Sequence, residues 1–168
     1  MPRASPKQWI ESVNPATGKV LKRFKASTRT DVDKAVEKAK KAFEKWKILS
    51  PSRRVVYLER AAKTLRAQKE KLARIITLEM GKTIRESISE VIKCAWVLEY
   101  YAENGERFLN PEPSKTDATD SYVTFEPLGV IASIMPWNFP LWQTVRFAAP
   151  TLMVGNTAVF KPSSTSPQ

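Results

Sequence analysis

The segment between Val130 and Phe160 constrains the fold more strongly than any other part of the chain. Two short runs rich in β-branched residues, from Val130 to Met135 and from Thr157 to Phe160, flank a stretch whose apolar residues recur at roughly helical spacing. Gly155 closes that stretch and suits a helix C-cap. This order predicts a strand, a helix and a parallel strand joined by a right-handed crossover. We therefore expect an α/β fold.

Two polar residues, Asn138 and Lys161, come directly after the predicted strands. Ligands of such units bind beyond the carboxyl ends of the parallel strands. The amide of Asn138 is a neutral donor that could face a developing oxyanion, and Lys161 could reach a ribose or a phosphate. Each residue also has a simpler interpretation, because Asn138 lies between two prolines, where turn residues are common, and Lys161 could be a solvated strand end.

The chain contains one cysteine, Cys94, and no histidine. An internal disulfide, the usual zinc sites and Ser-His or Cys-His catalytic pairs are therefore excluded, and we expect no metal site. Cys94 falls inside a predicted helix with nothing nearby to activate its thiolate. We interpret it as a structural cysteine.

Lys and Arg outnumber Asp and Glu 28 to 17, which gives a net charge of +11. Such a charge would attract nucleic acid. In segments such as DVDKAVEKAKKAFEKWK, however, acids alternate with the bases, which is typical of solvated helix faces. Nucleic-acid binding is therefore a disfavoured alternative. No apolar run approaches the ~20 residues of a membrane span, and MPRASPKQW lacks the apolar core of a signal peptide, so we expect a cytoplasmic protein.

The part of the chain before Val130 reads as a hairpin, a helical layer and a loop. After a basic tail, strands are predicted from Trp9 to Val13 and from Val20 to Lys25. Three helical regions follow, each preceded by an N-cap residue. The first is capped by Thr30 and has an apolar stripe from Val32 to Trp46. The second is capped by Ser50 and ends at Gly81. The third is capped by Thr83, paired with Glu86, and ends at Tyr101 or Ala102. Asn110 to Asp120 is expected to be a loop, and Ser121 to Phe125 a strand.

Several short motifs resemble those of the NAD(P)-dependent aldehyde dehydrogenase superfamily, in the same order over nearly the whole chain. They are NPATG at 14–18, EMGK at 79–82, EPLGV at 126–130, PWNFP at 136–140 and GNTAVFKPS at 155–163. The resemblance is to the N-terminal portion of the family and is strongest for succinate-semialdehyde dehydrogenases. It implies a truncated Rossmann-like cofactor domain: hairpin and helices over 1–108, an oligomerisation arm over 109–127 that pairs with a neighbouring subunit, and a first βαβ unit over 128–168.

The resemblance also assigns roles to the motif residues. Family members oxidise an aldehyde to an acid through a cysteine nucleophile, with hydride transfer to NAD or NADP. Asn138 matches the residue whose amide helps to hold the oxyanion, and Lys161 matches the lysine that contacts the adenosine ribose. The resemblance also places Asn138 itself among the cofactor-binding residues. The other matching residues are the cofactor-side wall, Ile134, Met135, Pro136 and Trp137, and the turn residues Pro162 and Ser163.

Two further positions bear on cofactor and substrate. Ser164 stands where NAD-preferring members commonly carry a glutamate for the ribose hydroxyls, so a serine favours NADP or tolerance of both cofactors. It could equally be an ordinary loop serine. Arg146 resembles an arginine that succinate-semialdehyde dehydrogenases use for the substrate carboxylate, although a salt bridge on the helix surface would explain it as well.

Other parts of the family's apparatus have no counterpart in the sequence. The nucleophilic cysteine and the general-base glutamate would follow Gln168, and Cys94 does not match the nucleophile. We expect the chain alone to be inactive and to self-associate or bind another chain through uncovered apolar surface. A non-catalytic assembly or binding module derived from the family is the alternative.

Overall fold

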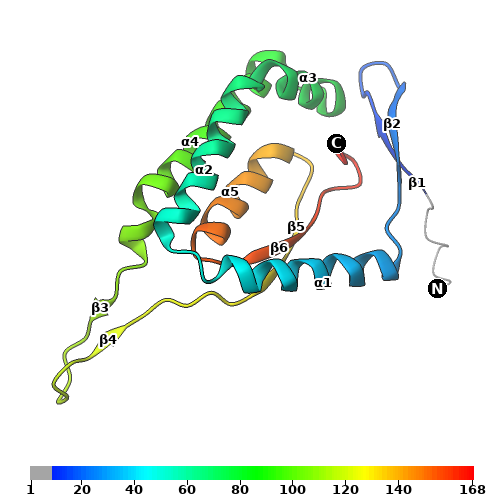
Figure 1. Cartoon of the computed structure of the whole chain (residues 1–168). Helices are drawn as coiled ribbons and strands as arrows, with labels where there is room; N and C mark the ends of the chain where they lie inside the picture. The colour runs from blue at the N-terminus through cyan, green and yellow to red at the C-terminus, as the bar shows by residue number, and fades with distance from the viewer. Residues whose placement is uncertain (1–8) are drawn as a thin grey trace.

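A computed structural model describes residues 9–168 as a layer of helices packed against a small parallel sheet (Figure 1). The basic tail before Trp9 lies outside the described residues. The elements, in chain order, are β1 (Trp9–Val13), β2 (Val20–Lys25), α1 (Arg29–Trp46), α2 (Pro51–Ala67), α3 (Lys69–Met80), α4 (Ile84–Phe108), β3 (Glu112–Pro113), β4 (Tyr122–Val123), β5 (Val130–Ile134), α5 (Pro140–Met153) and β6 (Thr157–Lys161).

The predicted strand–helix–strand unit is confirmed. β5 and β6 pair in parallel from Val130 opposite Thr157 to Ile134 opposite Lys161, and α5 connects them. At the start of both strands, the Asn156 side chain accepts a hydrogen bond of 2.9 Å from the buried Gly129 amide. This contact fixes the register of the pair, so that the carboxyl ends of β5 and β6 finish together.

The helical layer is built around α4, which packs against α2, α3 and α5. The largest buried cluster lies between α2, α4 and α5 and consists of Leu58, Ala62, Ala95, Leu98, Ala102, Ala149 and Met153. Alanines dominate it, so the helix backbones approach closely. At Gly105 of α4, an added Cβ atom would overlap the Met153 side chain of α5.

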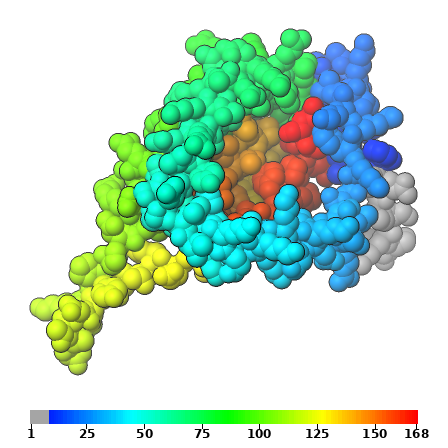
Figure 2. All heavy atoms as spheres, in the orientation of Figure 1, coloured from blue at the N-terminus to red at the C-terminus, as the bar shows by residue number. Residues whose placement is uncertain are grey.

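On the other side of the sheet, α1 crosses the β5–β6 pair (Figure 1). The Thr157 hydroxyl donates to the Ala39 carbonyl at 3.0 Å, and the Trp46 indole donates to the Leu152 carbonyl at 2.9 Å. The outer face of α1 carries exposed ion pairs one turn apart, such as Lys40 with Glu37. Figure 2 shows the C-terminal segment, orange to red, at the bottom of a hollow between α1, the helical layer and the N-terminal hairpin.

The first helix begins two residues earlier than predicted. Its N-cap is Thr28, not Thr30. The Thr28 hydroxyl accepts from the Asp31 amide at 3.2 Å, and the Asp31 carboxylate accepts from the Thr28 amide at 2.9 Å. These reciprocal bonds form a capping box, and they lower the pKa of Asp31 from its ordinary value.

Two helix ends also differ from the prediction. The second region is two helices, because the backbone at Gln68 leaves the helical range at φ −105°, ψ 15° between α2 and α3. α4 continues to Phe108 rather than ending at Tyr101 or Ala102. The helix extends because the turn around Gly105 is buried against Met153, and that packing offsets the low helix propensity of glycine. The Ser50 cap and the Thr83–Glu86 capping box are confirmed.

The segment expected as a loop and a five-residue strand is a narrow hairpin that projects from the body (Figure 1). β4 covers only two residues, Tyr122 and Val123, and it pairs antiparallel with Pro113 and Glu112 of β3. The predicted strand from Ser121 to Phe125 is therefore too long. Beyond these two pairs, the Ser114 amide donates to the Ser121 carbonyl at 2.8 Å.

Candidate functional site

The two predicted ligand-binding runs meet at the carboxyl ends of β5 and β6. Ile134 pairs with Lys161, and the Met135 amide donates to the Lys161 carbonyl at 3.1 Å. Ile134 and Trp137 are 76% and 54% exposed, so they form an open apolar wall beside Lys161. Residues about thirty positions apart in sequence thus share one edge of the sheet.

The Lys161 side chain is exposed, and its ammonium donates to the carbonyl of Pro162 at 3.1 Å. No carboxylate within the described residues forms an ion pair with it. Ser163 holds the following turn, since its hydroxyl accepts from the Thr165 amide at 3.2 Å. The ammonium of Lys161 is therefore available to a polar ligand at this edge.

Ser164 is exposed at the wall of a different cavity, of about 640 Å³, formed with the N-terminal hairpin. Glu11 of β1 also lines it. The Glu11 carboxylate accepts from Arg23 Nε at 2.7 Å, so its charge is paired. The cavity is therefore lined both by Ser164, from the loop after β6, and by the N-terminal hairpin.

Asn138 lies in the loop between β5 and α5 and is exposed. It lines a cavity of about 620 Å³ between the first turns of α4 and α5. The other lining residues are Lys82, Arg85, Glu86, Ser89, Glu90, Lys93, Phe139, Trp142 and Gln143. No side-chain hydrogen bond of Asn138 is present within the described residues, so its amide is free to contact a ligand.

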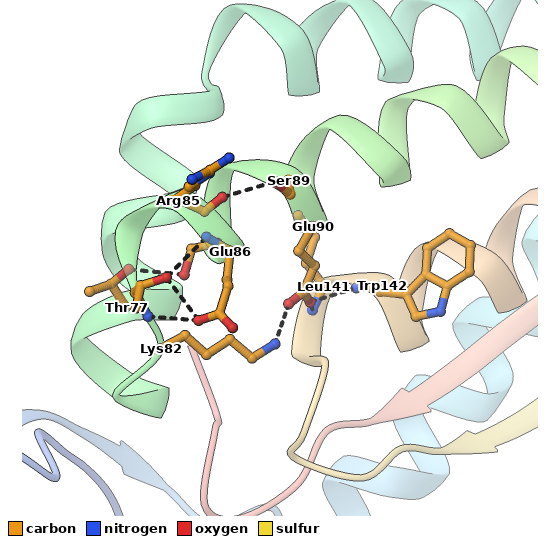
Figure 3. Close-up of polar contacts among 10 residues, drawn as sticks. Thr77, Lys82, Arg85, Glu86, Ser89, Glu90, Leu141 and Trp142 are labelled. Carbon is orange, nitrogen blue, oxygen red and sulfur yellow. Dashed lines mark hydrogen bonds and ion pairs between the residues drawn. The ribbon is translucent and has the colours of Figure 1, made fainter.

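A buried carboxylate beside Asn138 was not anticipated from the sequence. Glu90 of α4 is 4% exposed, and its Oε1 atom accepts from the amides of Leu141 and Trp142 at 3.1 and 3.0 Å (Figure 3). These amides belong to the first turn of α5, whose N-cap residue, Phe139, makes no side-chain cap. Glu90 therefore caps α5 from a neighbouring helix.

Lys82 completes this group. Its ammonium donates to Glu90 Oε2 at 2.6 Å and lies 3.8 Å from the centroid of the Phe139 ring. Lys82 is the last residue of the EMGK motif. A usable signal was the position of Glu90 three residues after Ser87 and four before Cys94, on the buried face of α4, where a charge requires a partner.

Arg146 is exposed on α5, eight residues after Asn138. Among the described residues it forms no ion pair, so the alternative of a helix-surface salt bridge is wrong for the part of the chain that the structure covers. It does not line the cavity beside Asn138.

Cys94 is fully buried in α4, as predicted. Burial, reinforced by the negative charge of Glu90, raises the pKa of its thiol to about 12. Between residues 9 and 168, no cluster of three His, Cys, Asp or Glu side chains is arranged to hold a metal ion. No helix in that range is long and apolar enough to cross a membrane.

The sequence profile of the aldehyde dehydrogenase family matches residues 1–168. A succinate-semialdehyde dehydrogenase of Mycobacterium tuberculosis, named for NADP(+), is 44% identical over 162 residues, which is 95% of this chain and 35% of that protein. Its counterpart in Mycobacterium avium is 41% identical over 163 residues, covering 95% of this chain and 34% of that protein. The chain thus spans about a third of the length of these relatives.

Solved structures give the same result. The crystal structure of succinic semialdehyde dehydrogenase from Streptococcus pyogenes in complex with NADP+ superposes with a TM-score of 0.90 at 34% identity. The match covers 94% of this chain and 35% of that one. At this identity and TM-score, the two chains share the same arrangement of helices and strands over the matched region.

Proposed function

Because this chain belongs to the aldehyde dehydrogenase family, we propose that the complete protein oxidises an aldehyde to its carboxylic acid with NADP or NAD. Residues 1–168 then supply the N-terminal part of a Rossmann-like cofactor domain. Within it, 1–108 form the hairpin and helices, 109–127 form an arm for oligomerisation, and 128–168 form the first βαβ unit.

The observation that carries this proposal is the shared edge at the carboxyl ends of β5 and β6. Ligands of open α/β sheets bind beyond this edge. Asn138 lies in the loop that follows β5, and Lys161 is the last residue of β6. Both residues are exposed. The edge therefore offers an amide donor and a cation to one ligand.

The residues at this edge fit a nicotinamide dinucleotide. When bound, that cofactor supplies the hydride acceptor. The exposed side chains of Ile134, Pro136 and Trp137, with the partly buried Met135, offer it an apolar wall. The unpaired ammonium of Lys161 can donate to ribose oxygens, and Pro162 and Ser163 hold the turn that follows.

Ser164 supports the use of NADP. A serine hydroxyl can donate to a 2′-phosphate, which a glutamate at the same position would repel. Glu11, the carboxylate that shares the Ser164 cavity, is already paired with Arg23 at 2.7 Å. We therefore expect the complete protein to use NADP at least as well as NAD.

Besides its place in the cofactor-binding set, Asn138 is proposed to act on the substrate. Its amide N–H groups would donate to the oxygen that becomes negative when a nucleophile attacks the aldehyde carbon. One such donor contributes about 3–4 kcal/mol to stabilisation of the transition state. Its exposure on the wall of a cavity of about 620 Å³ leaves room for an aldehyde beside it.

Arg146 is proposed to hold the carboxylate of an anionic aldehyde such as succinate semialdehyde. It is exposed and has no carboxylate partner within the described residues. An uncommitted guanidinium binds a carboxylate through two parallel hydrogen bonds. The names of the mycobacterial and streptococcal relatives favour the same substrate for this protein.

The chain alone should lack dehydrogenase activity, because its one cysteine, Cys94, is buried and its thiol is protonated at neutral pH. It should also associate with itself or with another chain. Tyr122, Val123, Phe125 and Leu128 are exposed on or next to the arm, and Leu128 is 88% exposed. These apolar side chains are the observation that favours the second candidate, a non-catalytic assembly module.

The test is NADPH and NADH formation by the complete protein with succinate semialdehyde and with butanal, an uncharged aldehyde of equal length. We expect turnover of both and a lower KM for succinate semialdehyde. Arg146→Gln should remove that difference. The absence of turnover with every aldehyde tried would refute the proposal and favour an assembly module.

Asn138→Ala should lower kcat by roughly 10²–10³, the usual cost of one oxyanion donor. Asn104→Ala, an amide deletion on α4 where the side chain donates to the Tyr100 carbonyl, is the matched control. An unchanged kcat in Asn138→Ala would remove the role proposed for this residue while leaving the family reaction intact.

A further inference from the structure

The buried carboxylate of Glu90 has no part in the function proposed above. We propose that Glu90, with Lys82 as its counter-ion, is a positioning residue that holds the first turn of α5 and thereby sets the orientation of Asn138. This inference rests on the proposed role of Asn138 in aldehyde oxidation. It concerns residues on α4 that do not belong to the PWNFP motif.

The backbone donors of the first turn of α5 are fully accounted for. Pro140, the first residue of the helix, has no N–H. The next two amides, of Leu141 and Trp142, both donate to Glu90 Oε1. The amide of Gln143 donates to the Phe139 carbonyl at 2.9 Å. A helix usually obtains these bonds from its own N-cap side chain, but here a residue about fifty positions earlier provides them.

The charge of Glu90 is balanced within the same group. A carboxylate that is 4% exposed is costly unless it is paired and hydrogen-bonded. Glu90 has the Lys82 ammonium on one oxygen and two amides, at the positive end of α5, on the other. Loss of the negative charge would leave Lys82, which is itself largely buried, facing two N–H donors.

Asn138 is oriented through the backbone rather than through its own contacts. The next residue, Phe139, is held at its ring by Lys82 and at its carbonyl by the Gln143 amide. Because the Asn138 side chain has no hydrogen bond within the described residues, only this backbone fixes the direction of its amide. A misplacement of about 1 Å in such a group can cost roughly 100-fold in rate.

The test is a double-mutant cycle in the complete protein with Glu90→Gln and Asn138→Ala, measured as kcat for aldehyde oxidation. Glutamine keeps the shape of Glu90 but has a single acceptor oxygen, so either the α5 amides or Lys82 lose their partner. Glu90→Gln alone should lower kcat by roughly 10–100-fold. In the Asn138→Ala background the same change should lower kcat by less than about threefold, because the donor that it positions is gone.

Glu99→Gln is the matched control, since it also removes a carboxylate from α4, where Glu99 pairs with Arg66 at 2.6 Å. It should leave kcat unchanged in both backgrounds. If Glu90→Gln does not accumulate as folded protein, Lys82→Met replaces it in the cycle, because this change removes the counter-ion that holds Glu90 and the contact with the Phe139 ring.

The outcomes separate the two proposals. Equal losses of kcat in both backgrounds would mean that Glu90 acts independently of Asn138, and this inference would be overturned while the proposed function stands. An unchanged kcat in Glu90→Gln would overturn it as well. A wild-type protein that oxidises no aldehyde would refute the proposed function itself.

Discussion

Burial of Cys94 should make its thiol almost inert in the folded chain. The side chain is 0% exposed, and the pKa of its thiol rises from an ordinary 9.0 to about 12. The shift lowers the thiolate fraction at pH 8 by roughly 10³, because each unit of pKa is a factor of ten. The thiolate is the reactive form, so reaction in the folded state is disfavoured by chemistry as well as by access.

The assay is the rate of absorbance change with a disulfide reagent such as dithionitrobenzoate at pH 8, with and without guanidinium chloride. The control carries Cys94→Ser and Trp96→Cys, which moves the thiol to a position of the same helix whose native side chain is 56% exposed. Native Cys94 should react roughly 10³-fold more slowly than the control, and at a similar rate after unfolding. Equal native rates would refute the reasoning.

The same shift makes stability depend on pH in a defined direction. Between about pH 9 and 12 the folded chain keeps the Cys94 proton that the unfolded chain releases. The contribution of the Cys94 thiol to the free energy of unfolding is therefore complete below pH 9 and is lost as the pH rises toward 12. Between pH 8 and 10 the loss is roughly 1.4 kcal/mol. The measurement is urea unfolding of the wild type and of Cys94→Ala at both pH values. Between pH 8 and 10, the free energy of unfolding should fall by this amount more in the wild type than in Cys94→Ala.

Two further changes test other parts of the structure. Ser164→Glu in the complete protein should raise KM for NADP at least tenfold and leave KM for NAD nearly unchanged, and a wild type that strongly prefers NAD would contradict the role of Ser164. Gly105→Ala should lower the free energy of unfolding by about 1–3 kcal/mol, because its Cβ would overlap Met153 Cγ and lie 2.9 Å from Cε. Helix propensity alone predicts a gain of up to about 1 kcal/mol, so an increase in urea midpoint would refute the packing argument.

Local signals were sufficient where one segment determines its own structure. The hairpin strands, the Thr83–Glu86 capping box and the strand–helix–strand unit all follow from turn residues, caps and periodicity. The N-cap predicted for the first helix was wrong because two threonines fit the same capping pattern. Thr28 and Thr30 are each followed by an aspartate three residues later, and in the structure the capping box forms at Thr28.

The residues of the candidate site at the strand ends were predictable from the sequence, but the contact between α4 and α5 was not. Asn138 and Lys161 follow strands that periodicity identifies, so their common edge could be expected from the sequence. The contact of Glu90 with the Leu141 and Trp142 amides depends on how α4 packs against α5, which no local pattern encodes. The extent of β4 depends in the same way on its pairing with β3.

In the hairpin of β3 and β4, the chain leaves the folded body after α4 and returns to it before β5. Every residue from 111 to 120 is exposed, while α4 before it and α5 after it pack directly on each other. The folded body therefore does not depend on covalent continuity through the tip of the hairpin. A protease that cut there would produce two peptides that still share one core and remain together as a nicked, folded protein.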